Sequence, residues 1–261
     1  MSVNKEPRFF APTAKDEIKP NPPIKDKEEY LKLFEQVNNE RFYGEGSTIY
    51  LSDPDAPKLI HEVSPSTRII ICLRDPVERA FSAYLMVLRQ GYLKEDFHIE
   101  IQKELNKEVD NTKARIRLEA GLYFNSVKRY TETFGGENIK ILIFEEMIMD
   151  PKRSVLDILN FLGINYELKG FNAEVHNPYR GRHRGKISQE ILESKIIVRL
   201  AKKLIPRSGR QFIEHKLLHT KSKPKISKKD KEPLVKFYED DVRKIQDFLG
   251  KKLPWKNFKE L

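Results

Sequence analysis

The most informative segment of this chain is Thr67-Arg-Ile-Ile-Ile-Cys-Leu-Arg-Asp-Pro-Val-Glu-Arg-Ala-Phe-Ser-Ala-Tyr84. Ile69 to Leu73 is an unbroken apolar run, which is typical of a parallel strand that is covered on both faces. Asp75 is a suitable N-cap, and Pro76 is a suitable first residue for the helix that follows. The stretch therefore predicts a buried strand that turns directly into a helix.

Arg74 and Ser82 are the candidate binding residues of this stretch. Arg74 stands at the carboxyl end of the predicted strand, and Ser82 lies two turns along the predicted helix. Ligands of open α/β sheets bind beyond the carboxyl ends of the strands. A guanidinium, a helix N-terminus and a hydroxyl together suit a phosphate group. The alternative is an ordinary strand-to-helix turn in which Arg74 pairs with a surface carboxylate.

The rest of the chain alternates between helical and strand patterns. Apolar spacing predicts helices over 28–37, 56–62, 76–90, 96–106, 113–120, 121–134, 151–162, 187–205 and 233–249. Ile139 to Phe144 predicts a second buried strand. This order predicts an α/β fold with a doubly wound parallel sheet flanked by helices. We expect one domain over 1–261, with an irregular segment at 1–25, a basic region at 180–231 and a final helix and tail at 233–258.

Composition and charge narrow the functional class. A chain of 261 residues with 39% hydrophobic residues can bury a core, and it contains no apolar run long enough to span a membrane. The amino terminus lacks the apolar region of a signal peptide, and Cys72, the only cysteine, lies in the first predicted strand. We therefore expect Cys72 to be core packing and the protein to be cytoplasmic.

The positive charge is concentrated in the last third of the chain. Residues 180–231 contain 17 Lys or Arg against 4 Asp or Glu, whereas the whole chain carries a formal charge of +10. This asymmetry indicates an anionic partner for that region. A polyanionic cofactor, a sulfated or acidic acceptor, a membrane surface and nucleic acid would each satisfy it.

The segment Leu73-Arg-Asp-Pro-Val-Glu-Arg-Ala-Phe-Ser-Ala-Tyr84 closely resembles the 3′-phosphate-binding segment of sulfotransferases that use 3′-phosphoadenosine 5′-phosphosulfate (PAPS). Further segments follow in the order of that family: Lys5-Glu-Pro-Arg-Phe-Phe10, Gly44-Glu-Gly-Ser-Thr-Ile-Tyr50, Gly121-Leu-Tyr123, Phe144-Glu145, Asp150-Pro151, and Phe237-Tyr238 through Asp241, Gly250 and Leu253 to Trp255. The resemblance spans residues 5–258 and favours the carbohydrate and heparan sulfate branch. It implies the nucleotide-kinase-like fold of these enzymes.

The resemblance implies roles for particular residues. It implies that Arg74 and Ser82 bind the 3′-phosphate of PAPS, and that the loop Arg180-Gly181-Arg182 closes over that phosphate and the adenine. It assigns Glu6 as the base that removes the acceptor proton. Glu45, whose flanking glycines suit close approach to a ligand, is the runner-up. The histidines show no metal-ligand spacing, so no metal site is predicted.

One family feature has no counterpart in the sequence. Family members begin with a strand and a Gly/Lys/Thr loop that cradles the 5′-phosphosulfate, and no such string occurs here. By this alignment the chain starts after that loop and lacks the usual first strand. Either the true start lies upstream or a deletion has left a relative that binds no cofactor, and we favour the upstream start. We expect little or no transfer activity from residues 1–261 alone.

These observations predict a sulfotransferase that moves a sulfuryl group from PAPS to a hydroxyl, on a saccharide acceptor. The principal rival is a catalytically inactive module that retains the nucleotide bisphosphate or glycan site. A nucleic-acid binder that uses residues 180–231 is disfavoured, because Phe212 is the only aromatic residue available there for stacking. Membrane contact through residues 191–205 is a further alternative, although the apolar face of that segment more simply packs on the domain.

Overall fold

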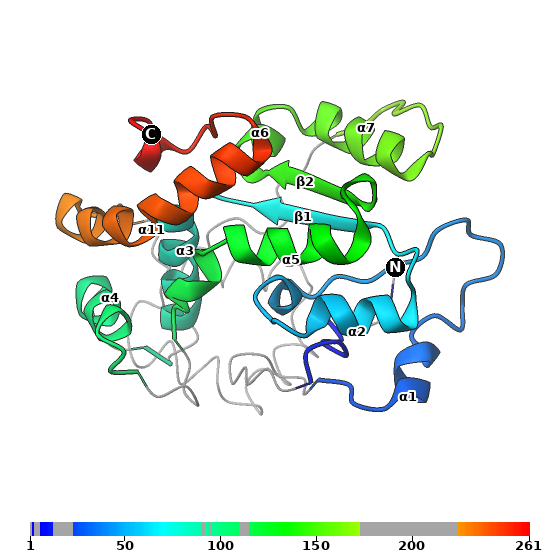
Figure 1. Ribbon diagram of the computed structural model, residues 1–261, viewed down its shortest axis with the longest axis horizontal. Helices are drawn as coiled ribbons and strands as arrows, with labels where there is room; N and C mark the ends of the chain where they lie inside the picture. Colours follow the sequence, from blue (N-terminus) through cyan, green and yellow to red (C-terminus); the bar gives the residue numbers. More distant parts are fainter. Residues whose placement is uncertain are drawn as a thin grey trace, which may run out of the picture.

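The computed structural model describes residues 2, 6–12, 23–89, 92–93, 95–109, 115–172 and 224–261. Arg180, Gly181 and Arg182, together with the helix expected over 187–205, lie outside the described residues. In the described part, two parallel strands, β1 (Ile69–Leu73) and β2 (Ile139–Ile143), lie between helices on either side (Figure 1). This arrangement agrees with the predicted α/β fold.

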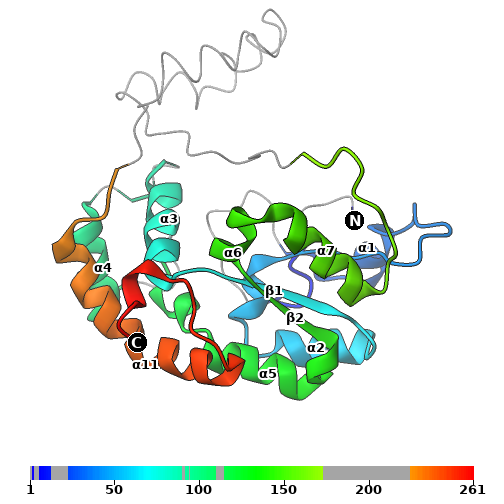
Figure 2. The same ribbon diagram turned by 90° about the horizontal axis from the view of Figure 1, so that it is seen from above.

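The helices follow the predicted order with some changes of length, except that the helix at Phe144–Met149 was not predicted. They are α1 (Lys27–Lys32), α2 (Ala56–Val63), α3 (Pro76–Arg89), α4 (Phe97–Leu105), α5 (Phe124–Phe134), α6 (Phe144–Met149), α7 (Pro151–Leu162) and α11 (Lys228–Leu249), with 3-10 helices η1 (Thr48–Leu51), η2 (Leu118–Gly121), η3 (Gly136–Asn138) and η5 (Lys256–Phe258). Helices α2 and α5 lie on one side of the strands, and α6 and α7 lie on the other (Figure 2). None of the described helices is long and apolar enough to cross a membrane.

The two strands pair in parallel register, from Ile69 opposite Ile139 to Leu73 opposite Ile143. The connection between them carries α3, α4 and α5. Parallel neighbours require a long crossover of this kind, because the chain must return to the same end of the sheet. Both strands therefore deliver their next residues, Arg74 and Phe144, to the same edge.

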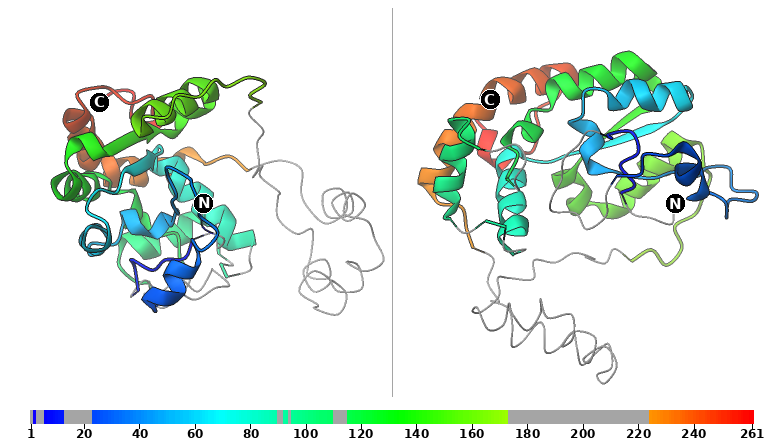
Figure 3. Two further views of the ribbon diagram at one scale, coloured as in Figure 1. Left: turned by 90° about the vertical axis from the view of Figure 1, so that its right-hand side faces the viewer. Right: turned by 90° about the horizontal axis from the view of Figure 1, so that it is seen from below.

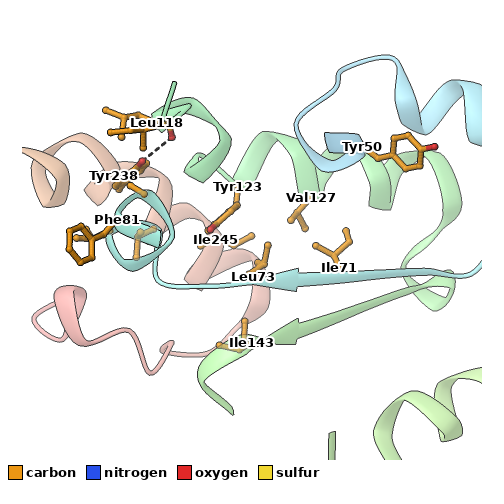
Figure 4. Packing of buried hydrophobic residues seen from close by; sticks show 14 of the residues in the cluster. Tyr50, Ile71, Leu73, Phe81, Leu118, Tyr123, Val127, Ile143, Tyr238 and Ile245 are labelled. Carbon is orange, nitrogen blue, oxygen red and sulfur yellow. Dashed lines mark hydrogen bonds between the residues drawn. The ribbon is translucent and has the colours of Figure 1, made fainter. Parts of the chain in front are cut away.

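The expected burial of β1 on both faces is wrong for the described part of the chain. Ile71 and Leu73 are 5% and 0% exposed and point toward α5, as Figure 4 shows, whereas Ile70 is 43% exposed. Cys72 is a free, exposed thiol, so the expectation that it packs in the core is also wrong. Successive side chains of a strand point to opposite faces, and on β1 the described residues bury only the face of Ile71 and Leu73.

Helix α11 packs against the start of α5. The two helices lie side by side in Figure 1 and in the right-hand view of Figure 3. The hydroxyl of Tyr238 donates to the carbonyl oxygen of Leu118 at 2.8 Å, the dashed line in Figure 4. A Cβ on Gly121 would lie 2.9 Å from the Tyr238 ring, so only glycine allows this close packing. These contacts explain why Gly121 and Tyr238 belong to the motifs identified in the sequence.

Helix α5 begins three residues later than the sequence predicts. The Asp241 carboxylate accepts hydrogen bonds from the amide nitrogens of Tyr123, at 2.6 Å, and Phe124, at 3.2 Å. A carboxylate at the first helical amides both satisfies unpaired donors and interacts favourably with the helix dipole. A residue 117 positions away in the sequence thus determines where this helix starts.

Three further expectations about helices need correction. The helix predicted over 113–120 is not an α-helix in its described part, where only the 3-10 helix η2 forms at Leu118–Gly121: the Glu104 carboxylate accepts hydrogen bonds from the amides of Arg117 and Leu118, at 2.9 and 2.7 Å, and Arg117 has a φ of 57°. Helix α1 ends at Lys32 instead of residue 37. Helix α11 begins before Pro233, because the hydroxyl of Ser227 caps its first turn.

Candidate functional site

The carboxyl edge of the sheet holds Arg74 in a defined place. Its guanidinium carbon lies 4.8 Å from the centroid of the Phe144 ring, which follows the neighbouring strand. The hydroxyl of Tyr123 donates to the Arg74 carbonyl oxygen at 2.9 Å, so the backbone is held from the side of α5. A cation over an aromatic face gains about 0.5–2 kcal/mol, depending on how far it is desolvated. Arg74 is therefore positioned by packing as well as by its backbone.

The Arg74 side chain also carries an unsatisfied donor. Its Nε is buried and makes no hydrogen bond with the described residues. Leaving a buried donor without a partner costs about 1–3 kcal/mol. The hydroxyl of Ser82, half-buried on α3, likewise has no recorded hydrogen bond within the described residues. These donors suit the oxygens of an anionic ligand, which is what the sequence predicts for them.

The first amides of α3 are already occupied. Asp75 caps the helix as expected, and its Oδ1 accepts from the amides of Val77 at 3.0 Å and Glu78 at 3.3 Å. The idea that these amides would bind a phosphate is therefore wrong. Asp75 is 1% exposed, and burial raises the pKa of its carboxyl despite these hydrogen bonds. The candidate phosphate site thus consists of the side chains of Arg74 and Ser82.

The carboxyl-terminal tail makes hydrogen bonds near the carboxyl end of β1. Asp75 Oδ2 accepts from the backbone and side-chain nitrogens of Asn257, at 3.2 and 2.9 Å. Glu145 accepts from the Asp75 amide at 3.1 Å and from the Trp255 indole nitrogen at 3.1 Å. Glu145 and Trp255 were recognised in the sequence only as members of ordered motifs. The structure shows that they connect the tail to the turn that carries Arg74.

A second polar group gathers around the Glu45 carboxylate. The Arg8 amide donates to Ser47 Oγ at 3.1 Å, and Ser47 Oγ donates to Glu45 Oε2 at 3.2 Å. The Phe10 amide donates to the Tyr50 hydroxyl at 3.3 Å, and that hydroxyl donates to Glu45 Oε1 at 2.7 Å. Two hydroxyl groups therefore link Glu45 to the backbone of the segment that contains Glu6. Arg8 and Ser47 were not singled out from the sequence, although both lie in quoted motifs.

Glu6 occupies a constrained backbone position in this group. Its φ is 58°, and that of Arg8 is 55°, both in the left-handed region that residues other than glycine seldom adopt. Such conformations persist where the surroundings impose them, and they concentrate at functional sites. Burial raises the pKa of the Glu45 carboxyl, although hydrogen bonds from Tyr50 and Ser47 act in the opposite direction. Glu45 therefore holds a proton more readily than an exposed glutamate.

The two polar groups lie in different places. Figure 4 shows Tyr50 toward the amino end of β1, whereas Leu73 and Ile143 mark the carboxyl ends of the strands. No recorded contact within the described residues joins Glu6 to Arg74. The structure thus links the backbone of Arg8 and Phe10, close to Glu6 in the sequence, to Glu45, and it places Arg74 at the carboxyl edge of the sheet. In the described ranges, no group of three His, Cys, Asp or Glu side chains is arranged to hold a metal ion.

Comparison with known proteins finds a protein family that matches most of this chain. Residues 21–239 match the family described as Sulfotransferase domain. The matched range includes Arg74 and Ser82, whereas Glu6 precedes it. A crystal structure of a sulfotransferase from Alicyclobacillus acidocaldarius superposes with a TM-score of 0.67 at 25% identity, covering 97% of this chain and 85% of that one. The match of structures shows that the fold is that of a sulfotransferase.

Curated relatives come from the carbohydrate branch. Heparan sulfate glucosamine 3-O-sulfotransferase 6 of Homo sapiens is 26% identical over 135 residues, which are 52% of this chain and 39% of the relative. Carbohydrate sulfotransferase 15 of Homo sapiens is 28% identical over 121 residues, 40% of this chain and 22% of the relative. The chain therefore matches well under half the length of these relatives.

Proposed function

This chain belongs to the sulfotransferase domain family, and on that premise we propose that it transfers a sulfuryl group from PAPS to a hydroxyl of a carbohydrate. The match of residues 21–239 supports the reaction class. The names of the relatives support a saccharide acceptor, since both refer to enzymes that sulfate carbohydrates. PAPS is the donor implied by the resemblance of the segment around Arg74 and Ser82 to the 3′-phosphate-binding segment of PAPS-dependent enzymes.

The observation that carries the donor half of the proposal is the orphaned nitrogen of Arg74. A buried guanidinium nitrogen without a partner, held by an aromatic ring at the edge where α/β proteins bind ligands, fits a phosphate oxygen. Ser82 would add a hydroxyl donor from α3. In this role the two side chains bind and orient the nucleotide end of the donor, and they take no part in proton transfer.

The acceptor half of the proposal rests on Glu6. A sulfuryl group moves to a hydroxyl more easily when a base removes the hydroxyl proton, and carboxylates are suitable bases. Glu45 supports this assignment indirectly, because its carboxylate is engaged by the hydroxyls of Ser47 and Tyr50, which in turn hold the backbone beside Glu6. In this arrangement Glu6 acts as the base and Glu45 positions its segment.

Calorimetry with two nucleotides tests the donor site. We expect adenosine 3′,5′-bisphosphate to bind far more tightly than adenosine 5′-phosphate, and Arg74→Ala to weaken bisphosphate binding by roughly 10- to 100-fold, as expected for a charge-assisted hydrogen bond. Ser82→Ala should have a smaller effect in the same direction. Arg243→Ala removes an equal charge from the exposed face of α11 and should leave the affinity unchanged. Equal affinity for the two nucleotides would disprove the site.

A further inference from the structure

Two carboxylates lie beside Arg74 without pairing with it. Asp75 follows Arg74 directly in the sequence, and Glu145 follows Phe144, whose ring contacts the Arg74 guanidinium. Glu145 Oε1 also accepts from the Asp75 amide at 3.1 Å, so the Glu145 carboxylate lies against the turn that carries Arg74. Among the described residues, Arg74 has no recorded ion pair. Opposite charges at such short range attract, so other hydrogen-bond donors must hold both acids in place.

The carboxyl-terminal tail supplies these hydrogen-bond donors. Trp255 Nε1 donates to Glu145 Oε2 at 3.1 Å. Asn257 donates to Asp75 Oδ2 from its backbone nitrogen at 3.2 Å and from its Nδ2 at 2.9 Å. The other oxygen of each acid accepts from amides of the turn that joins β1 to α3. Every carboxylate oxygen of the two acids therefore has a partner other than the arginine.

The indole of Trp255 is held by packing as well as by its hydrogen bond. It is 0% exposed, and its ring lies 5.9 Å from the ring of Tyr123 and 6.4 Å from that of Phe258. The Tyr123 hydroxyl in turn donates to the carbonyl oxygen of Arg74. Trp255 thus touches both supports of Arg74, the carboxylate beside it and the tyrosine that holds its backbone. A side chain that packing already orders loses little further freedom when it donates, so the indole is a pre-organised partner for the acid.

We infer that Trp255 and Asn257 are positioning residues for the candidate phosphate site: they occupy the carboxylates of Glu145 and Asp75 and so leave the Arg74 guanidinium available to a phosphate group. This inference rests on the proposed function, because it concerns the nucleotide that Arg74 would bind. A carboxylate that loses its tail partner pairs with Arg74 and competes with the phosphate for the same N–H donors. In this role the tail contacts neither the nucleotide nor the reacting atoms.

Calorimetry on Trp255→Phe tests the inference. Phenylalanine keeps an aromatic ring but removes the N–H that donates to Glu145. We expect the affinity for adenosine 3′,5′-bisphosphate to fall roughly 3- to 10-fold, because the released carboxylate competes for Arg74, and the affinity for adenosine 5′-phosphate to stay the same. Asn257→Ala removes one of the two nitrogens that donate to Asp75 and should show a smaller loss of the same kind. Asn257 is half-buried, so this variant guards against a folding failure of Trp255→Phe.

Two double variants distinguish competition for Arg74 from a simple loosening of the tail. Trp255→Phe/Glu145→Gln removes the competing negative charge, and its amide oxygen can still accept from the Asp75 amide. Its affinity for the bisphosphate should therefore return to within about twofold of that of the unchanged protein. In Arg74→Ala/Trp255→Phe, the second substitution should cause no further loss, because carboxylate and phosphate compete for the same guanidinium. A tryptophan with a merely structural role would show neither the rescue nor this non-additivity.

Two control variants remove comparable contacts that do not involve these acids. Lys251→Gln breaks the exposed ion pair between the start of the tail and Glu146 on α6. Tyr130→Phe removes one hydrogen bond of a buried aromatic side chain, to the carbonyl oxygen of Tyr50. Both variants should bind adenosine 3′,5′-bisphosphate as the unchanged protein does, and an equal loss in either would overturn the inference.

The remaining outcomes also decide the question. The inference is wrong if Trp255→Phe and Asn257→Ala bind the bisphosphate normally, if they lose affinity for both nucleotides alike, or if Glu145→Gln fails to rescue Trp255→Phe. A failure of the candidate phosphate site itself looks different: the unchanged protein would then bind both nucleotides equally, and both proposals would fall. Where the unchanged protein prefers the bisphosphate and Arg74→Ala removes that preference, a negative result in the tail variants refutes the role of the tail alone.

Discussion

Arg74 and Phe144 occupy equivalent positions at the ends of neighbouring parallel strands, and the guanidinium of one lies 4.8 Å from the ring centroid of the other. They are the residues that follow Leu73 and Ile143, the last pair of the ladder. The ring faces the cation, so it restricts the guanidinium without consuming its hydrogen-bond donors. The strand pairing thus presents an oriented, incompletely satisfied arginine at the edge of the sheet.

Phe144→Leu should weaken adenosine 3′,5′-bisphosphate binding several-fold. Leucine keeps an apolar side chain but removes the aromatic face, which contributes about 0.5–1 kcal/mol where the cation is partly exposed. Calorimetry measures the loss, and Phe248→Leu on α11 is the control, because Phe248 contacts Phe124 and not Arg74. An affinity equal to that of the unchanged protein would mean that the ring does not orient Arg74.

In a protein that also carries an upstream strand and phosphate loop, Glu6→Gln should lower turnover by roughly 10²- to 10⁴-fold, because glutamine keeps the shape of the side chain but accepts no proton. Affinity for adenosine 3′,5′-bisphosphate should stay the same. Steady-state kinetics with PAPS and a saccharide acceptor measure the effect, with Glu28→Gln on the exposed side of α1 as the control. Normal turnover in Glu6→Gln would assign the base to another residue, and Glu45 would be the next candidate.

Glu45→Gln should destabilise the protein more at about pH 4 than at about pH 7. Burial raises the pKa of Glu45 in the folded state above its ordinary value, so the folded protein binds this proton more tightly than the unfolded chain does. The resulting stabilisation is present in acid and is lost as the pH rises through the raised pKa. Glutamine lacks this dependence. Denaturant titrations at the two pH values measure it, and Glu62→Gln, at an exposed position of α2, should show no such difference.

Asp241→Ala should lower the free energy of unfolding by about 1–3 kcal/mol. It removes the acceptor of the Tyr123 and Phe124 amides, which is both a charged hydrogen-bond partner and the cap of α5. The neighbouring Asp240→Ala, whose side chain is 82% exposed, should change stability by less than about 0.5 kcal/mol. Chemical denaturation compares the two variants. Equal effects would show that the carboxylate of Asp241 does not stabilise the joint between α5 and α11.

The local elements of this protein could be predicted because their causes lie within a few residues. The apolar runs that became β1 and β2 were recognised with boundaries correct to one residue. Helix α7 was predicted over its full length, since Asp150 caps it, Pro151 begins it and Gly163, with a φ of 66°, ends it. Asp75 and Pro76 define the start of α3 in the same way. Short-range hydrogen bonds and fixed backbone angles determine such features.

The candidate site was predicted only in part. The order of its motifs indicated Arg74, Ser82 and Glu6 as functional residues, but not how their surroundings hold them. The Glu45 network, the occupied amides of α3 and the contact of Arg74 with Phe144 each involve partners that the spacing of residues does not reveal. The sequence predicts that the N-terminus of α3 binds an anion. In the structure its first amides instead donate hydrogen bonds to the Asp75 side chain, so they are not available to a ligand.

The strands, the helix caps and the order of the segments that define the family could be recognised from the amino-acid sequence, because these features depend on neighbouring residues. The outward orientation of Cys72 and Ile70 and the capping of α5 by Asp241 became visible only in the folded protein. Each of these depends on which distant segments pack together. Because successive side chains of a strand point to opposite faces, every strand has two faces. Which of them is covered depends on how the other segments pack against it.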